Sequence, residues 1–499
     1  MVRHNKLSRN YFKRGISYLQ RNGVAKSIYK ATERLVRDRD EKDYSENFEK
    51  NQPTPEELSA QRKTKFNHPY HISILVPCYE SDPVTFLAMV KSVVLQTYTN
   101  WELCILDASA KDDLRTVLRN FLDENFLEIK DITGVDIRDK VHYKFALSNK
   151  GIAGNTNEAL DMAMGQYIAL LDHDDLITPN ALFEVMCMLN KKDSFTEKSS
   201  GARATYRLIY SDEDKTDYSN THYFDYHQKP DFDPILLRTN NYVCHFLVVE
   251  KNLARSVRGF HPEYDGAQDH DFILRCTEDL SSSEVGHIPK VLYHWRSSAN
   301  STAENPEAKL YAYDAGKRAV TDHLRRMNEA AYAQDTEHLG FFKVIYKPNK
   351  GRVITMSTQE YLSLDEHRFR NLDAEYVMVL DDSLEPVNKD YINQMLSYMR
   401  RDKIGIVTGK IIGMNKKIES AGYMRDAQGK SVPCFAGLNS KYSGYLHRAV
   451  LQRICDDCDK GCMLVRLSAI ECVNAKKSLR KGYELVYDPF SIFKRRKKV

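Results

Sequence analysis

Four short apolar runs, each followed by polar residues, constrain the fold of this chain more than any other feature. The runs are residues 72–77, 101–106, 141–147 and 167–171. Helical spacing of apolar residues separates some of them, and one helix is predicted over residues 155–164 with Met164 facing inward. Strands that alternate with helices form right-handed βαβ units and a mainly parallel sheet. Ligands bind beyond the carboxyl ends of such strands, so the polar residues there are candidates for a site.

The fourth run ends in a cluster of acids. Asp172, Asp174 and Asp175 come directly after the apolar residues. Clustered carboxylates repel one another unless a cation lies among them, and oxygen ligands suit Mg²⁺ or Mn²⁺. The alternative is a strand-end turn followed by a helix cap, since Thr178-Pro179 can open the next helix. The position after three βα units favours the metal site.

Charge is distributed unevenly along the 499 residues. Residues 1–37 carry ten Lys/Arg and one acid, and residues 494–498 are all basic, which leaves a net charge of −10 for the rest of a chain of net charge +4. An acidic body argues against binding of nucleic acid, whereas basic ends suit an anionic membrane surface. Apolar spacing over residues 12–35 predicts basic amphipathic helices, which either pack on the protein or lie on a membrane.

No run approaches the ~20 apolar residues of a membrane helix, and no apolar signal segment opens the sequence. Most of the ten cysteines stand singly in apolar runs, which is typical of reduced thiols. We therefore expect a cytoplasmic protein, peripheral on the inner face of the plasma membrane. Zinc ligation by cysteines is an alternative in the last part of the chain, although the spacing is not a paired CxxC pattern. The cysteines concerned are Cys455, Cys458, Cys462 and Cys472.

Several short sequence motifs follow one another between residues 70 and 325. They are Ile72–Pro77 with Tyr79 and Glu80, Asp107, Ser148–Asn157, Leu171–Asn180, Ser211–Lys215, Lys229–Pro234, Gly266–Asp271 and Ile288–Arg296. Together they resemble the motifs of family-2 glycosyltransferases with the GT-A nucleotide-diphospho-sugar fold, in particular bacterial enzymes that build cell-surface polysaccharides. The resemblance implies an α/β fold in which helices flank a mainly parallel sheet.

The resemblance also implies a set of site residues. Those expected to bind the nucleotide-diphospho-sugar donor are Pro77, Tyr79, Glu80, Asp107, Asn149, Gly154, Asn155, Asp172 and Arg296. Those expected to hold Mn²⁺ or Mg²⁺ are Asp172, Asp174, Asp175 and His294. Asp269 matches the catalytic base, and Asp271 is the second candidate. For Asp269 the alternative is an acid favoured by a helix N-terminus, and for His294 a structural residue beside Trp295.

The implied reaction is transfer of a sugar from a UDP- or dTDP-sugar, with inversion, to a growing polysaccharide or polyprenyl-linked glycan. Negative charge grows on the leaving diphosphate, which a divalent cation stabilises, and a carboxylate takes the proton of the acceptor hydroxyl. Two positions depart from the family pattern. Ser298 replaces a histidine that many relatives carry, and Gln268 precedes Asp269 where glutamate is frequent.

An aromatic stretch precedes the expected base. Sugars stack on aromatic rings, so these side chains are candidates for an acceptor wall, the alternative being ordinary packing of a covering loop. They are Tyr218, Tyr223, Phe224, Tyr226 and His227. The polar residues 191–205 are predicted to form a loop.

Four regions are predicted along the chain: a basic helical segment and linker (1–65), a GT-A domain (66–335), a truncated GT-A-like domain (340–490) and a basic tail (491–499). In the third region, residues 377–386 resemble the metal-binding strand of the family. Only about 35 residues lie between the start of this region and that strand, which is too few for a nucleotide pocket. Residues 470–482 are too few to include the segment that would carry a catalytic base. Ser383 stands where a further acid is expected. We therefore predict a non-catalytic domain that supports the first or holds acceptor.

Two other functions compete with transfer. A scaffold would keep the fold and bind donor or glycan while a partner transferase did the chemistry, and the intact acids at 172–175 and 269 argue against it. A nucleotidyltransferase needs a Gly-rich basic phosphate loop after the first strand, and residues 78–84 contain neither glycine nor Lys/Arg.

Overall fold

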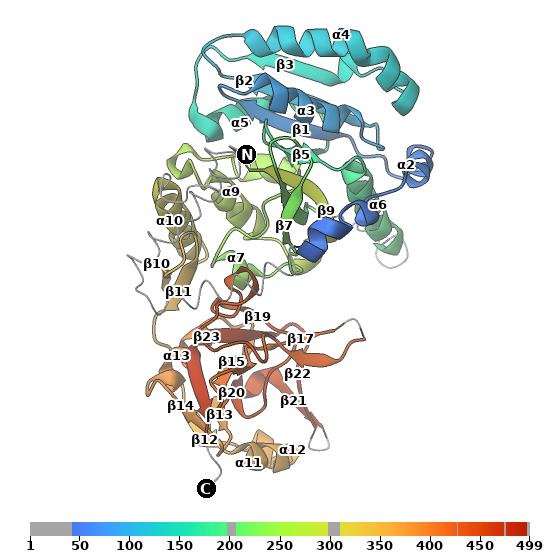
Figure 1. Cartoon of the computed structure of the whole chain (residues 1–499). Coiled ribbons are helices and arrows are strands. Elements are labelled where there is room, and N and C mark those ends of the chain that lie inside the picture. Colours follow the sequence, from blue (N-terminus) through green and yellow to red (C-terminus); the bar gives the residue numbers. More distant parts are fainter. Residues whose placement is uncertain (1–41, 197–205, 298–309, 427, 474–475, 497–499) are drawn as a thin grey trace, which may run out of the picture. The chain divides into compact units, whose positions relative to one another are not determined.

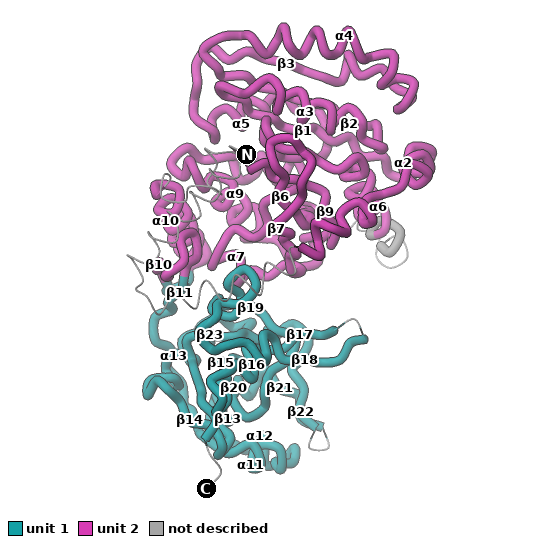
Figure 2. Tube along the Cα trace, in the orientation of Figure 1, with its two compact units in different colours: residues 1–40, 329–331, 343–499 teal, residues 41–328, 332–342 magenta. Residues whose placement is uncertain are grey.

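The computed structural model describes residues 42–196, 206–297, 310–426, 428–473 and 476–496 (Figure 1). They form two compact units (Figure 2). Unit 2 contains residues 42–328 and 332–342, and unit 1 contains residues 329–331 and 343–496. The predicted amphipathic helices over 12–35 and the position of Ser298 lie outside the described residues. Among those residues, no helix is long and apolar enough to cross a membrane.

Unit 2 is built on a nine-stranded sheet in the order β3-β2-β1-β4-β8-β6-β9-β5, with β7 on β6. Its first four strands are all parallel. They are β1 (Ile72–Cys78), β2 (Trp101–Asp107), β3 (Val141–Phe145) and β4 (Tyr167–Leu170). These are the four apolar runs of the sequence, so the α/β fold class with a parallel sheet is confirmed.

The other half of this sheet mixes directions. Strand β8 is antiparallel to β4 and β6, whereas β6 and β9 are parallel, and β5 and β7 add antiparallel edges. The strands are β5 (Leu176–Ile177), β6 (Leu208–Thr216), β7 (Tyr223–His227), β8 (Leu247–Glu250) and β9 (Val285–Arg296). This half carries the polar motifs that follow residue 208.

Helices cover both faces of the parallel half. The apolar side chains of α3 (Pro83–Val94) share one core cluster with Ile74 and Leu103 of β1 and β2. Leu75 alternates with Ile74 and is buried outside that cluster, and α5 (Gly151–Met162) contacts β1 and β2. The remaining helices of unit 2 are α2 (Pro55–Arg62), α4 (Asp113–Thr133), α6 (Ala181–Thr196), α7 (Pro234–Leu237), α8 (Lys251–Ser256), α9 (Gln268–Thr277) and α10 (Leu310–Arg326).

Three local predictions are corrected by the structure. The helix predicted over 155–164 begins at Gly151 and ends at Met162, and Met164 is 65% exposed rather than inward. Residues 191–196 extend α6 instead of forming a loop. The predicted linker contains α2, whose capping box at Thr54 satisfies the free backbone N–H groups of a helix start.

Unit 1 repeats the mixed half of the sheet of unit 2. Its strand order is β12-β13-β20-β15-β23-β14, with β16 on β15 and β19 on β23. Step by step, the directions match those of β1-β4-β8-β6-β9-β5: parallel, antiparallel, antiparallel, parallel, antiparallel. The bounds are β12 (Val353–Met356), β13 (Tyr376–Leu380), β14 (Leu384–Pro386), β15 (Ile404–Ile412), β16 (Ile418–Ser420), β19 (Arg453–Ile454), β20 (Cys462–Arg466) and β23 (Glu484–Arg495).

The repetition is incomplete. Among the described residues of unit 1, nothing pairs with the outer edge of β12 where β2 and β3 flank β1. The hairpin of β21 (Ile470–Val473) and β22 (Lys476–Leu479) stands between β20 and β23, where unit 2 has α8 and α9. Other elements are helices α11 (Thr358–Ser363), α12 (Glu366–Arg370) and α13 (Tyr391–Tyr398), and strands β10 (Ala331–Asp335), β11 (Phe342–Tyr346), β17 (Tyr423–Arg425) and β18 (Ser431–Pro433).

The predicted basic tail is also corrected. Strand β23 continues to Arg495, so residues 491–495 belong to the sheet. Arg495 forms an ion pair with Glu419 at 2.6 Å, and Arg496 lies 3.4 Å from Glu385. Part of the basic excess at this end is therefore neutralised within unit 1, which leaves less charge for an anionic surface.

Candidate active site

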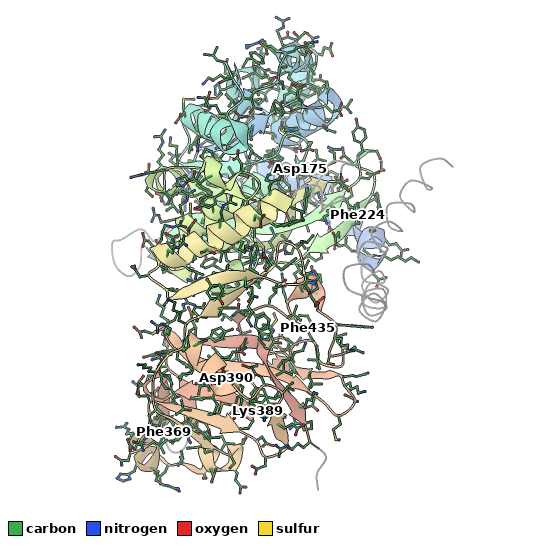
Figure 3. The ribbon with its side chains drawn as sticks, turned by 90° about the vertical axis from the view of Figure 1, so that its left-hand side faces the viewer. Asp175, Phe224, Phe369, Lys389, Asp390 and Phe435 are labelled. Carbon is green, nitrogen blue, oxygen red and sulfur yellow. The ribbon has the colours of Figure 1, made fainter. Side chains whose placement is uncertain are left out.

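The acids after β4 occupy two kinds of environment. Asp175 is 1% exposed, and its carboxylate accepts hydrogen bonds from the Tyr293 hydroxyl at 2.5 Å and the Arg296 backbone N–H at 2.7 Å. Burial and the charges of Asp172 and Asp174 raise its pKa. These contacts join the end of β4 to β9, so Asp175 (labelled in Figure 3) holds the loop together and we leave it out of the proposed metal site.

Arg296 fixes the same loop with its side chain. Its Nε–H donates to the Asp174 carbonyl oxygen, and its Nη1–H groups donate to the Tyr218 carbonyl and the Asn220 side chain. Its Nη2 is buried without a partner within the described structure. A guanidinium nitrogen in this state is suited to an anionic ligand, which agrees with the predicted role in donor binding.

Asp172 and Asp174 retain the features expected of cation ligands. Burial raises the pKa of Asp172, and the charges of Asp174 and Asp269 raise it further, against the opposing effect of His245. Within the described residues, no group of three His, Cys, Asp or Glu side chains could hold a metal by itself. Two carboxylates with substrate phosphates are a frequent arrangement for Mg²⁺, so Asp172 and Asp174 fit such an ion.

The two acids of α9 differ in the donors that hold their carboxylates. Asp271 is fully buried and accepts from Nε and Nη2 of Arg275, at 2.8 and 2.6 Å. Asp269 accepts from the His270 backbone N–H at 2.8 Å and from the Asn241 side chain at 2.9 Å. An acid held by a buried guanidinium is a poor proton acceptor. The geometry favours Asp269 over Asp271 as a base.

The predicted nucleotide residues gather at the ends of β1 and β2. Asp107 is fully buried and accepts from the Tyr143 hydroxyl at 2.6 Å and the Ser109 N–H at 3.0 Å. Glu80 accepts from the Ala110 N–H at 2.8 Å. Pro77 lies in β1, and Tyr79 directly after that strand is 52% exposed.

The predicted loop before α5 is a network of side-chain amides. Asn149 Oδ1 accepts from the Gly151 N–H at 3.0 Å and from the Asn155 side chain at 2.9 Å. Gly151 has a positive φ of 77°, which favours glycine. A Cβ at Gly154 would lie 2.6 Å from the Lys150 Cβ. Asn149, Gly154 and Asn155 thus shape the start of the helix, and free helix N–H groups suit an anion.

His294 and the aromatic stretch have partners within unit 2. His294 Nδ1 lies 2.5 Å from Asp214 Oδ1, and the Tyr44 hydroxyl donates to Asp214 Oδ2 at 2.6 Å. Phe48 stacks on Tyr223 with ring centroids 3.8 Å apart. We therefore leave His294 out of the proposed metal site.

The acceptor-wall hypothesis is correspondingly weakened. Tyr44 stacks on Tyr226 at 5.1 Å, and His227 Nδ1 lies 2.8 Å from Glu213. Phe224 (labelled in Figure 3) stacks on His222. Tyr218 is 51% exposed, and its hydroxyl donates to Asp82. Packing of a covering segment therefore accounts for Tyr223 and Tyr226, whereas Tyr218 stays available to a ligand.

Sequence reasoning missed the segment between α7 and β8. Asn241 contacts Asp269, and His245 stacks on Tyr293 with ring centroids 4.7 Å apart. The His245 Nδ1 lies 3.1 Å from Glu213. The only signal was polar residues between an apolar helix and an apolar strand, which by itself does not distinguish a site from a loop.

Comparison with known proteins gives the family. Residues 73–240 match the family model described as glycosyl transferase family 2. Residues 73–240 therefore form a domain similar to those of glycosyltransferase family 2. The predicted resemblance to family-2 glycosyltransferases is confirmed for this domain, and so is the predicted architecture of an α/β sheet with a parallel half.

Similar proteins are found in several bacteria. An uncharacterized protein, y4gI, of Sinorhizobium fredii is 27% identical over 81% of this chain and 48% of its own length. The O-antigen biosynthesis protein RfbC of Myxococcus xanthus is 31% identical over 52% of this chain and 18% of its own. The glucosyltransferase WfgD of Escherichia coli, named for transfer from UDP-Glc to GlcNAc-diphosphoundecaprenol, is 36% identical over 25% and 44%. The chain spans about half the length of y4gI and a smaller share of RfbC and of WfgD.

Solved structures resemble the chain only distantly. TarS residues 1–349 of S. aureus with UDP-GlcNAc is 14% identical over 51% of this chain and 66% of its own, with a TM-score of 0.36. A mannosyltransferase of Pyrobaculum calidifontis in complex with GDP-Man and Mn²⁺ is 13% identical over 54% and 69%, with a TM-score of 0.35. Scores this low carry no argument about ligands.

Proposed function

We propose that the chain is an inverting glycosyltransferase that moves a sugar from a UDP- or dTDP-sugar to a growing cell-surface polysaccharide or lipid-linked glycan. The observation that carries the proposal is the proximity of Asp172 and Asp269. Asp172 follows β4 and Asp269 begins α9, yet the charge of Asp269 raises the pKa of Asp172, which burial already raises. This electrostatic coupling supports a site in which Asp172 would lie on the metal side and Asp269 would act as the base.

In this mechanism Asp269 accepts the proton of the acceptor hydroxyl while that oxygen attacks the sugar carbon. Its two oxygens each have one protein donor, and a carboxylate oxygen has a second lone pair for the incoming proton. Direct attack from the side opposite the nucleotide inverts the anomeric centre. General base catalysis of this kind contributes about 10²–10⁴-fold to the rate.

Asp172 and Asp174 would hold Mn²⁺ or Mg²⁺ together with the donor diphosphate. When bound, the cation stabilises the negative charge that develops on the leaving diphosphate. Arg296 keeps the Asp174 carbonyl and the Asp175 carboxylate in place. Asp107 and the Asn149–Asn155 loop lie where the nucleotide is expected, at the carboxyl ends of β1 and β2 and the start of α5.

The acceptor and the location are the less constrained parts of the proposal. RfbC and WfgD are named for O-antigen biosynthesis and for a diphosphoundecaprenol acceptor, which supports a lipid-linked glycan here. Ten Lys/Arg within residues 1–37 support peripheral attachment to anionic lipid at the inner face of the plasma membrane. Liposome co-sedimentation tests this, and binding that ignores both anionic lipid and removal of residues 1–37 would contradict it.

The central test is a panel of UDP- and dTDP-sugars with Mn²⁺ or Mg²⁺, measured as release of nucleoside diphosphate with and without a glycan acceptor. We expect turnover with one donor, loss of turnover on chelation, and a loss of about 10²–10⁴-fold in Asp269→Asn. Donor binding without turnover would favour a non-catalytic scaffold instead.

A further inference from the structure

The Asn241 side chain, which lies outside α9, donates a hydrogen bond to the Asp269 carboxylate. Asn241 lies between α7 and β8, in a segment with firm supports. The Asn240 N–H donates to the Leu236 carbonyl at 3.2 Å. Tyr242 is 1% exposed, and its hydroxyl accepts the Asp233 N–H at 2.7 Å. The buried Lys229 ammonium donates to the Val243 carbonyl at 3.0 Å. The backbone on both sides of Asn241 is therefore held in place.

The nitrogen and the oxygen of the Asn241 amide differ in their hydrogen bonding. Its Nδ2–H donates to Asp269 Oδ2 at 2.9 Å, which sets the amide orientation because a carboxylate oxygen can only accept. Its Oδ1 is buried and has no hydrogen-bond partner within the described structure. An unsatisfied buried acceptor costs about 1–3 kcal/mol, so folding stability alone does not explain an asparagine at this position.

Together with the His270 N–H on Oδ1, the Asn241 donor gives each oxygen of Asp269 one fixed partner. Two donors from two elements determine both the rotation and the position of the carboxylate. We propose that Asn241 is the positioning residue of Asp269, which keeps this carboxylate aligned with the acceptor hydroxyl. This inference rests on the proposed role of Asp269 as the base.

A positioning role has a definite kinetic signature. Misplacement of a reacting group by about 1 Å costs roughly 10²-fold in rate, so Asn241→Ala lowers kcat by about 10–100-fold and leaves binding of UDP and dTDP unchanged. Asn241→Leu keeps the branched shape of the side chain and removes the unsatisfied carbonyl. We expect it to unfold at the same temperature as the natural protein or a higher one, with kcat lowered as in Asn241→Ala. Neighbouring Asn240→Ala is the matched control and keeps full kcat.

A double-variant cycle separates action through Asp269 from independent damage. If Asn241 acts through Asp269, then Asn241→Ala adds nothing to Asp269→Asn, and the double variant has the residual rate of Asp269→Asn alone. The rates are measured as nucleoside diphosphate release with the panel donor that supports turnover, at enzyme concentrations that quantify the residual rate. Binding of UDP and dTDP is measured by calorimetry for every variant.

The outcomes distinguish the two proposals. Full kcat in Asn241→Ala or Asn241→Leu, with Asp269→Asn inactive, would overturn the positioning role and leave the proposed function intact. A double variant slower than Asp269→Asn by the full factor of Asn241→Ala would also overturn it. Full transfer by Asp269→Asn would overturn both the base assignment and the positioning role.

Discussion

Units 1 and 2 each place an acid at the equivalent point of their own sheet, yet the electrostatic environments of the two acids differ. Asp172 and Asp381 each stand five residues after the tyrosine that begins β4 or β13. Burial and like charges raise the pKa of Asp172. Hydrogen bonds from the Ser383 side chain and backbone lower the pKa of Asp381. The first environment is compatible with the proposed cation, whereas the charge of Asp381 is stabilised by hydrogen bonds within the protein.

The different segments that connect the strands in the two units explain this electrostatic difference. In unit 2, α9 and the Asn241–His245 segment bring the charges of Asp269 and His245 to Asp172. In unit 1 the β21–β22 hairpin replaces that helix, and Arg495 donates to Ser383. The same strand topology therefore gives a site or a neutralised turn, depending on what the connections bring to the strand ends. Unit 1 is proposed to be non-catalytic for this reason.

The largest expected effect tests the comparison directly. Asp172→Asn removes a charge from the proposed cation site and lowers transfer by about 10²–10³-fold, as loss of transition-state charge stabilisation does. The matched Asp381→Asn in unit 1 keeps transfer within twofold of the natural rate (~0.4 kcal/mol). Nucleoside diphosphate release measures both. Equal losses in the two variants would show that unit 1 takes part in the chemistry.

The next comparison uses one phenylalanine from each unit. Phe369 is 5% exposed in unit 1, and Phe369→Ala lowers the free energy of unfolding by ~3–5 kcal/mol. Phe48 is half-buried on Tyr223, so Phe48→Ala costs about 2 kcal/mol.

Phe48 has a second consequence that Phe369 lacks. It packs on the β6–β7 hairpin, whose connecting turn accepts hydrogen bonds from Arg296. We therefore expect Phe48→Ala to slow transfer per folded molecule by about 10-fold, and Phe369→Ala to leave it unchanged. Denaturant unfolding and initial rates, normalised to folded protein, check this. An unchanged rate in Phe48→Ala would separate the hairpin from the site.

A smaller effect concerns pH. Burial raises the folded pKa of Asp175 above its unfolded value, so ionisation of Asp175 destabilises the fold above the folded pKa. That penalty disappears as the pH falls from the folded towards the unfolded pKa. A tenfold difference between the folded and unfolded acid constants corresponds to about 1.4 kcal/mol. Asp175→Asn, which still offers an acceptor to the Arg296 N–H, should raise the unfolding free energy at neutral pH.

The advantage of Asp175→Asn should then shrink as the pH is lowered, because the natural protein regains stability and the variant does not titrate. Thermal unfolding across pH measures it. In unit 1 the sign is opposite, because the Ser383 side chain lowers the pKa of Asp381. Ser383→Ala should therefore lower stability at neutral pH, and that loss should shrink towards acid pH. A gap that widens towards acid pH would contradict the assignment.

The smallest effect is expected in the cysteines of unit 1. Cys458 is buried against Met463, and Arg453 Nη1 donates to Cys455 at 3.2 Å. These packing roles predict no stoichiometric zinc in the purified protein by metal analysis. Cys458→Ala should cost about 1 kcal/mol, as loss of a small buried group does. One zinc per chain, lost in Cys458→Ala, would restore the zinc hypothesis.

The sequence predicted some features better than others. The strands β1, β2 and β4 were recognisable because they are continuously buried, and their apolar runs carry that signal. The start of α5 was misplaced because Asn149, Asn155 and Asp265 satisfy its first turn by contacts that spacing does not reveal. Asn241 was missed because its partner, Asp269, belongs to a different helix.

The sequence by itself determined the alternation of strands and helices, the acids at residues 172–175 and 269, and the family. Local apolar periodicity and ordered motifs encode these features within short stretches. Only the tertiary structure decided which acids have a buried structural partner. Asp175 and Asp271 are held by Tyr293 and Arg275, whereas Asp269 is held by the uncharged donors Asn241 and the His270 N–H and raises the pKa of Asp172. A carboxylate's role depends on its neighbours in space, and only folding brings those neighbours to it.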